Sequence, residues 1–164
     1  MTEQANQLEI HSSIISRLQT QHHSLQVILA SIDSKRIELK PDQAKWNIHE
    51  TIGHLVAYQQ MFMERVAQAL SEEVPFFCPY NADSDADFEY WRTDDIEHLM
   101  SQLNSEREKL SKVLLNLTDE QANRIAMHKR YGSHDIMQWA EFFLLHEAHH
   151  LYKIFQLAYD IEIK

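Results

Sequence analysis

Hydrophobic residues recur at helical spacing in four long segments of the chain: from about Gln4 to Ile32, Asn47 to Leu70, Thr93 to Leu117 and Ser133 to Tyr159. Spacings of three, four and seven residues are typical of one apolar face on a helix. In the first segment these positions are Leu8, Ile14, Ile15, Leu18, Leu25, Ile28 and Leu29. The pattern predicts one all-α domain over residues 1–164, an up-down four-helix bundle with its core between the facing stripes.

The helical pattern stops between Ser71 and Tyr90, which predicts a long loop between the second and third helices. Aromatic residues in this loop (Phe76, Phe77 and Tyr80) indicate that part of it packs down, over the mouth of a pocket. The aspartates at 83, 85 and 87 lack the glycine and terminal glutamate of a calcium loop, so we expect a solvated segment. Thr118–Gln121 reads as a short helical turn, residues 122–131 as a connection, and Ser133 as the N-cap of the last helix.

Charge and composition narrow the function classes. The chain has a net charge of −10 with histidine uncounted, which argues against a nucleic-acid-binding surface. Cys78 is the only cysteine, the first residues do not resemble a signal peptide, and no apolar run reaches the roughly 18 residues of a membrane span. We therefore expect a cytoplasmic protein with no membrane or nucleic-acid partner. Eleven histidines are the one compositional indication of a metal.

Two histidines of the last helix are spaced as metal ligands. His146 and His150 lie about 40° apart around a helix, so their imidazoles can converge on one point. An HxxxH pair commonly supplies two nitrogen ligands, and a third must come from another segment. His54 is the best third ligand, because it lies in the middle of the second helix at the edge of its apolar stripe. Three imidazoles would leave a position for water or substrate. Histidines that fill the core without metal are the alternative.

The acid–base residues near these histidines are less well defined. Glu50 stands three residues after Asn47, as in a capping box, and it also lies one turn before His54. Glu50 therefore has two possible roles, as a helix cap or as a residue at the metal. His149 is beside His150 in sequence, and together with Glu50 it is a weak candidate for a general base. Glu147 is a weaker one. Lys153, one turn beyond His150, either attracts an anionic substrate or extends along the apolar surface.

Two motifs resemble those of a known family. The segments Trp46-Asn47-Ile48-His49-Glu50-Thr51-Ile52-Gly53-His54-Leu55 and His146-Glu147-Ala148-His149-His150 are similar to the motifs of the DinB superfamily, the DinB/YfiT-like metal-dependent enzymes. The resemblance covers most of the chain and implies a divalent metal, nickel or zinc, bound by His54, His146 and His150. One departure is Leu151-Tyr152-Lys153, where many members have a glycine and a glutamine after the histidines.

The resemblance also implies a function. Members act as hydrolases or as transferases of a low-molecular-weight thiol, and are often dimers. For this chain we therefore expect a metal-dependent enzyme that hydrolyses a small-molecule substrate or transfers such a thiol to an electrophile, as a homodimer. The alternative is a non-enzymatic, stress-associated metal-binding bundle that acts as a dimeric interaction module. The sequence does not distinguish them.

Overall fold

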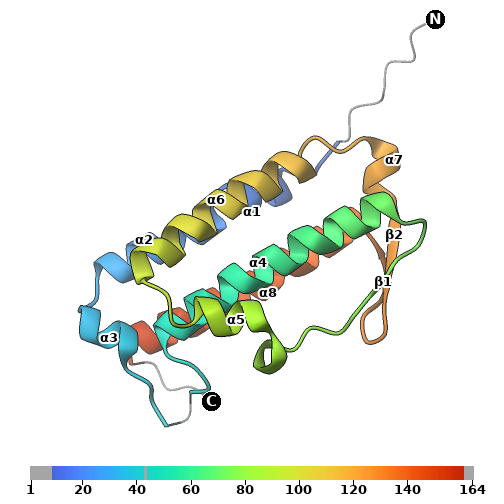
Figure 1. The fold of residues 1–164 in the computed structure, drawn as a ribbon. Helices are drawn as coiled ribbons and strands as arrows, with labels where there is room; N and C mark the ends of the chain where they lie inside the picture. Colours follow the sequence, from blue (N-terminus) through green and yellow to red (C-terminus); the bar gives the residue numbers. More distant parts are fainter. Residues whose placement is uncertain (1–8, 43, 161–164) are drawn as a thin grey trace, which may run out of the picture.

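A computed structural model describes residues 9–42 and 44–160 (Figure 1). Three long helices form most of a bundle: α4 (Ile48–Ser71), α6 (Ile96–Leu114) and α8 (Ile136–Ala158). The N-terminal segment completes the bundle in three pieces: α1 (Ser12–Thr20), the 3-10 turn η1 (Gln21–His23) and α2 (Ser24–Ala30). A short helix, α3 (Ser34–Glu38), follows it. The expected start at Gln4, with Leu8, lies outside the described residues.

The N-terminal segment made of α1, η1 and α2 is not the single helix that its apolar stripe predicts. The tighter turn η1 interrupts it and directs two polar side chains into the bundle. Gln21 Nε2 donates to the Leu144 carbonyl at 2.9 Å, and the buried His22 lies 3.2 Å from an Arg107 nitrogen through its Nδ1. Periodicity alone cannot reveal this break, because apolar positions on both sides of η1, Leu18 before it and Leu25 after it, are buried in the interior of the bundle.

The direction of the helices differs from the expected up-down order. Gln59 donates to the Leu103 carbonyl at 2.9 Å, and His49 Nε2 lies 2.6 Å from the Asp94 carbonyl, so residue numbers rise together along α4 and α6. These two helices are therefore parallel, while α8 runs antiparallel to α4 (Figure 1). The prediction was wrong because the segment 72–95 returns along the bundle. It is long enough to span the roughly 36 Å of a helix of α4's length.

That segment is also more ordered than the loop we expected. It contains β1 (Phe76–Phe77), the 3-10 turn η2 (Ala82–Ser84) and α5 (Ala86–Trp91). The acidic run supplies a helix cap, since Asp85 accepts from the backbone nitrogen of Asp87 at 3.0 Å. Phe88 of α5 is fully buried against Ala57 and Trp46. Burial of this ring holds α5 against α4, which accounts for the order of the segment.

A small sheet closes one end of the bundle and corrects the all-α prediction to mostly helical. β2 (Ile125–His128) pairs in parallel with β1 and antiparallel with β3 (Gly132–Asp135). β2 alternates exposed and buried positions, but its four residues are too few to stand out in the sequence. The N-cap of α8 is Asp135, in a capping box with Gln138, and not Ser133. The short turn at residues 118–121 is α7 (Asp119–Ala122), capped by Thr118.

The core has two main parts along the bundle. One contains the buried side chains Leu18, Phe62, Leu110, Trp139 and Phe143, and the other contains Ile52, Val56, Leu99, Leu103 and Ile154. On α4, His54 lies between Ile52 and Val56 of the second group, and Tyr58 of the first group follows one turn later. On α8, the segment with His146 and His150 separates Phe143 of the first group from Ile154 of the second. The histidine cluster thus sits where the two hydrophobic groups meet. Among the described residues, no helix has the length and hydrophobicity needed to cross a membrane.

Candidate metal centre

The structure brings His54, His146 and His150 together. His54 Nε2 lies 3.1 Å from His150 Nε2, and His150 Nε2 lies 3.2 Å from His146 Nε2. One turn of α8 separates the latter two residues, and the antiparallel packing of α4 on α8 places His54 opposite them. The ligand atoms of all three residues lie within 4.8 Å of one another.

Hydrogen bonding within the cluster does not account for this arrangement. An imidazole nitrogen carries either one proton or one lone pair, so the two contacts of His150 Nε2 would have to share a single proton or a single lone pair, which makes both hydrogen bonds weak. Three lone pairs directed at one point suit a shared cation. Tetrahedral ligands at about 2.0–2.1 Å from a zinc ion are about 3.4 Å apart, close to the observed separations. The donor set therefore fits a divalent metal.

Aromatic side chains keep the cluster largely out of water. The Tyr58 ring stacks on His146 with centroids 3.6 Å apart and an angle of 20°, and the Trp46 ring lies 4.8 Å from His54. Phe88 approaches His54 edge-on at 5.8 Å. Burial lowers the pKa of each of the three histidines to about 3, with a smaller contribution from neighbouring positive groups. All three imidazoles are therefore neutral near pH 7 and have a lone pair to offer.

The segment between α4 and α6 orients His54. His54 Nδ1 lies 3.5 Å from the hydroxyl of Tyr80, and this hydroxyl donates to the Asp85 carboxylate at 2.8 Å. Because the hydroxyl proton goes to Asp85, the tyrosine oxygen is left to accept from His54 Nδ1, which keeps the Nε2 lone pair for the cluster. Burial and the hydrogen bond to Asp85 raise the pKa of Tyr80, so it stays protonated.

Sequence reasoning missed these supporting residues. Tyr80 was expected only as part of a packed loop, and Asp85 as a solvated charge. Tyr58 could have been found, because it lies one helical turn after His54 and so shares its face of α4. No spacing rule connects Tyr80 to His54, since the fold of the segment 72–95 decides that contact.

The weaker candidates have different surroundings. Glu50 completes the capping box of α4 by accepting from the Asn47 backbone nitrogen at 3.1 Å, and it also pairs with Arg92. These contacts give Glu50 a structural role at the start of α4. His149 is exposed beside His150, with ring centroids 5.1 Å apart. Glu147 is buried against Arg107 and Gln21, on another face of α8.

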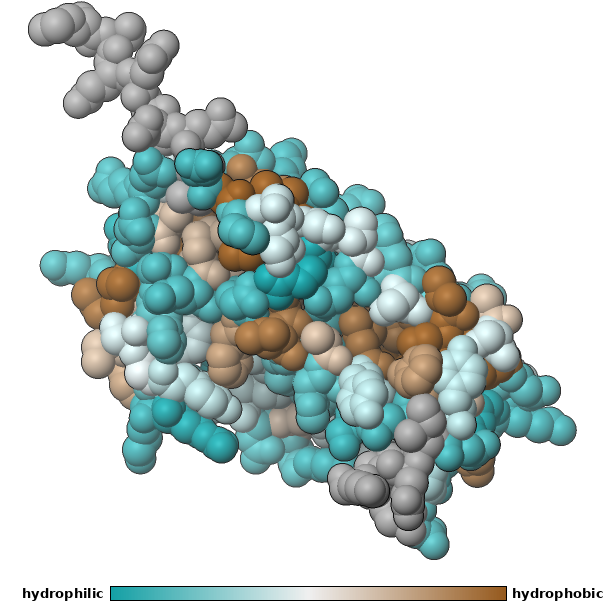
Figure 2. All heavy atoms as spheres, turned by 180° about the vertical axis from the view of Figure 1, so that it is seen from behind, coloured by the Kyte–Doolittle hydropathy of each residue, from teal (hydrophilic) through white to brown (hydrophobic). Residues whose placement is uncertain are grey.

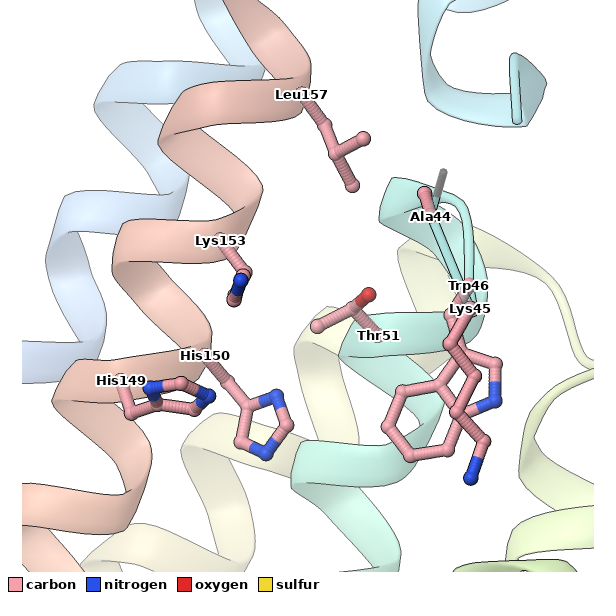
Figure 3. Close-up of a pocket in the computed structure, with 8 residues that line it drawn as sticks. All are labelled: Ala44, Lys45, Trp46, Thr51, His149, His150, Lys153 and Leu157. Carbon is pink, nitrogen blue, oxygen red and sulfur yellow. The ribbon is translucent and has the colours of Figure 1, made fainter. Parts of the chain in front are cut away.

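Two cavities reach the cluster. The first, of about 360 Å³, lies between α8 and the segment leading into α4. In Figure 3, His150 and Lys153 project from α8 towards this space, with Trp46 across from them. The second, of about 530 Å³, includes His146, Tyr58 and Tyr80 in its lining. A metal held by the three histidines would thus be accessible from both the His150 side and the His146 side.

These features define a helix-bundle protein with a three-histidine cluster, buried at His54 and half-buried at His146 and His150, that is open to two cavities. Comparison with known proteins places it in a family: the chain belongs to the DinB superfamily, whose model matches residues 17–154. It is similar to the uncharacterized protein YuaE of Bacillus subtilis, with 24% identity over 147 residues that cover 82% of this chain and 90% of that protein.

Two solved structures from Bacillus subtilis share the fold. YfiT, described as a probable metal-dependent hydrolase with an unusual four-helix bundle topology, matches with a TM-score of 0.79 and 19% identity. The match covers 92% of this chain and 89% of YfiT. The DinB-like protein YjoA matches with a TM-score of 0.60 and 15% identity, over 93% and 94% of the two chains. At these identities the likeness concerns the fold.

Proposed function

We propose that this protein is a metal-dependent enzyme whose divalent ion, nickel or zinc, is held by His54, His146 and His150. The observation that carries the proposal is the convergence of three neutral Nε2 atoms, with separations of 3.1 and 3.2 Å between neighbours. A structural ion usually has a complete set of protein ligands, whereas three histidines next to open cavities leave room for an exogenous ligand. The family and the fold of YfiT are consistent with this assignment.

The residues around the cluster suit hydrolysis of a small substrate. A divalent ion in this position would supply a Lewis acid that lowers the pKa of water or a thiol. Trp46 and Leu157 provide an apolar wall in the first cavity, and Lys153 a positive charge. His149 lines the same cavity, exposed beside His150, and is our candidate for moving a proton to or from the reacting group.

Transfer of a low-molecular-weight thiol to an electrophile is the second candidate reaction. The presence of two cavities favours it, because a transfer reaction must hold two organic molecules, whereas hydrolysis needs one and water. One cavity reaches the cluster at His150 and the other at His146. Two substrates could therefore approach from different sides. Product analysis with and without added thiol distinguishes the two reactions.

Metal content per chain tests the proposal. We expect near-stoichiometric nickel or zinc in the wild-type protein by mass spectrometry, and a loss of affinity of at least ~10-fold in His54→Ala, His146→Ala and His150→Ala. His149→Ala is the matched control, since it removes a neighbouring imidazole outside the cluster and should keep the metal. Circular dichroism verifies folding. A folded wild type that takes up no metal after reconstitution would overturn the proposal.

A non-enzymatic, dimeric interaction module is the alternative function. The face formed by α1, α2 and α8 carries a band of hydrophobic residues (Figure 2), and Val27 of α2 and Leu145 of α8 are 72% and 58% exposed. A homodimer stays a prediction, which sedimentation of wild type and Leu145→Glu would test.

Cobalt substitution separates the enzyme from the non-enzymatic interaction module. An enzyme's ion should change its absorption spectrum on adding azide or a thiol, and an ion closed to ligands should not.

A further inference from the structure

The second cavity is positively charged in an otherwise acidic protein. Its lining includes Arg65, Lys129 and Arg130, and none of the described residues that line it is an aspartate or glutamate. The chain as a whole has a net charge of −10. Clustered cations repel one another, and an anionic ligand would relieve that repulsion.

Arg65 is the most informative of these cations. It is only 9% exposed, and it forms no ion pair with any carboxylate in the described part of the chain. One guanidinium nitrogen donates to the Cys78 carbonyl at 2.6 Å, and the group lies over the Phe77 ring at 5.2 Å. The other arginine with such burial, Arg107, has a carboxylate partner in Glu147. A buried charge without an opposite charge is costly, and an anionic ligand beside Arg65 would offset that cost.

The turn between β2 and β3 adds neutral and charged donors to the same cavity. His128 Nδ1 accepts from the backbone nitrogens of Arg130 and Tyr131, at 3.0 and 3.3 Å. Accepting at Nδ1 places the proton of the neutral imidazole on Nε2, so His128 has a donor to offer. Arg130 lies over the Tyr131 ring at 5.5 Å, at the exposed side of the cavity. The donors thus extend from the buried Arg65 to the surface.

The geometry points to an anion-recognition subsite in this cavity, in which Arg65 and Arg130 bind a carboxylate or phosphate group of a small molecule. His146, Tyr58 and Tyr80 line the same cavity, so the rest of such a molecule would extend to the histidine cluster. As a description of the substrate, the inference rests on the proposed function. The depth of Arg65 favours a small molecule over a polymer, because a buried guanidinium is reached only by a slender group.

Anion binding to metal-free protein tests the subsite without depending on activity. Phosphate and malonate are titrated separately into chelator-treated protein, at constant ionic strength, and followed by calorimetry, with neutral dimethyl malonate as the uncharged probe. We expect saturable binding of phosphate or malonate, which identifies the favoured anion, and none of the ester. Arg65→Met should weaken binding at least ~10-fold, because a charge-assisted hydrogen bond is lost from a buried position. Arg130→Gln should weaken it less.

Lys112→Gln is the matched control, since it removes an exposed cation on α6 and should leave binding unchanged. If Arg65→Met does not fold, Arg65→Lys and Arg130→Gln carry the test. Absence of saturable binding, or equal affinity in wild type and the arginine variants, overturns the inference. Metal content measured on the same preparations separates the two proposals. If the wild type takes up metal but binds neither anion, the subsite alone is rejected. If the wild type binds an anion but takes up no metal on reconstitution, the proposed function alone is rejected.

Discussion

Glu147 and Arg107 form an ion pair inside the bundle, although Glu147 lies in sequence between two members of the three-histidine cluster, His146 and His150. Both side chains are almost fully buried, at 2% and 1% exposure. Gln21 donates to the other Glu147 oxygen at 2.7 Å, and Gln59 accepts from Arg107 Nε at 2.7 Å. The pair therefore connects α8, α6, η1 and α4 beside the cluster. Its position makes Glu147 a structural residue and not a base at the metal.

Removal of the Glu147 carboxylate should strongly destabilise the fold. Glu147→Ala leaves the Arg107 charge buried without a partner, and we expect the free energy of unfolding to fall by about 3–5 kcal/mol. Glu141→Ala is the control, because Glu141 is also on α8 and pairs with an arginine, Arg17, but at a partly exposed position. It should cost about 0–1 kcal/mol. Urea denaturation followed by circular dichroism measures both, and equal losses would contradict the prediction.

The Tyr80 hydroxyl should contribute to metal affinity through His54. Tyr80→Phe removes the group that meets His54 Nδ1 and the Asp85 carboxylate, so the imidazole is less firmly oriented. We expect a loss of metal affinity of about 10-fold, at the lower end for residues that support a ligand. Competition with a chromogenic chelator measures the affinity. Tyr90→Phe removes a hydroxyl from an exposed ring and should have no effect, and an unchanged affinity in Tyr80→Phe would rule out the orienting role.

Gly53 should be required for the close approach of α5 to α4. A Cβ at Gly53 would lie 3.0 Å from the backbone Cα and nitrogen of Arg92, and 3.1 Å from the carbonyl carbon of Trp91. Backbone atoms cannot move aside as a side chain can, so Gly53→Ala should displace α5. We expect a net destabilisation of about 1–2 kcal/mol despite the better helix propensity of alanine. Chemical denaturation measures this change, and a more stable variant would show that α5 can shift freely.

Stability should fall in mild acid partly because of His22. Burial first, and then the nearby Arg107, lower the pKa of His22 from its ordinary 6.5 to about 3. Between pH 6.5 and 3, His22 is protonated in the unfolded chain but stays neutral in the folded protein. The contribution of neutral His22 to stability is therefore fully present above pH 6.5 and declines as the pH falls towards 3. Between pH 7 and 5 we expect the wild type to lose about 2 kcal/mol more than His22→Gln.

The neighbouring residue provides the control for His22. His23 is exposed, so His23→Gln should keep the pH dependence of the wild type. Denaturant unfolding at several pH values between 5 and 7 gives the slopes. Identical slopes for the wild type and His22→Gln would contradict the lowered pKa of His22. A group with the same pKa in the folded and unfolded states adds nothing to the pH dependence of stability.

Local patterns in the sequence were enough to predict the helical bundle and to select His54, His146 and His150. The reason is that a helix converts spacing into direction: residues four apart share a face, and an apolar stripe identifies the face that is buried. The capping box at Asn47 and Glu50 was likewise visible, since both members lie within one turn. What these residues can bind follows from their chemistry.

Only the tertiary structure decided the features that join distant segments. The parallel arrangement of α4 and α6 depends on the path of residues 72–95, and the small sheet depends on pairing between β1 and β2, some 50 residues apart. The contact of Tyr80 with His54 and the burial of Arg65 beside the β2–β3 turn arise in the same way. Such contacts are made by chain path and packing, and neither leaves a periodic pattern along the sequence.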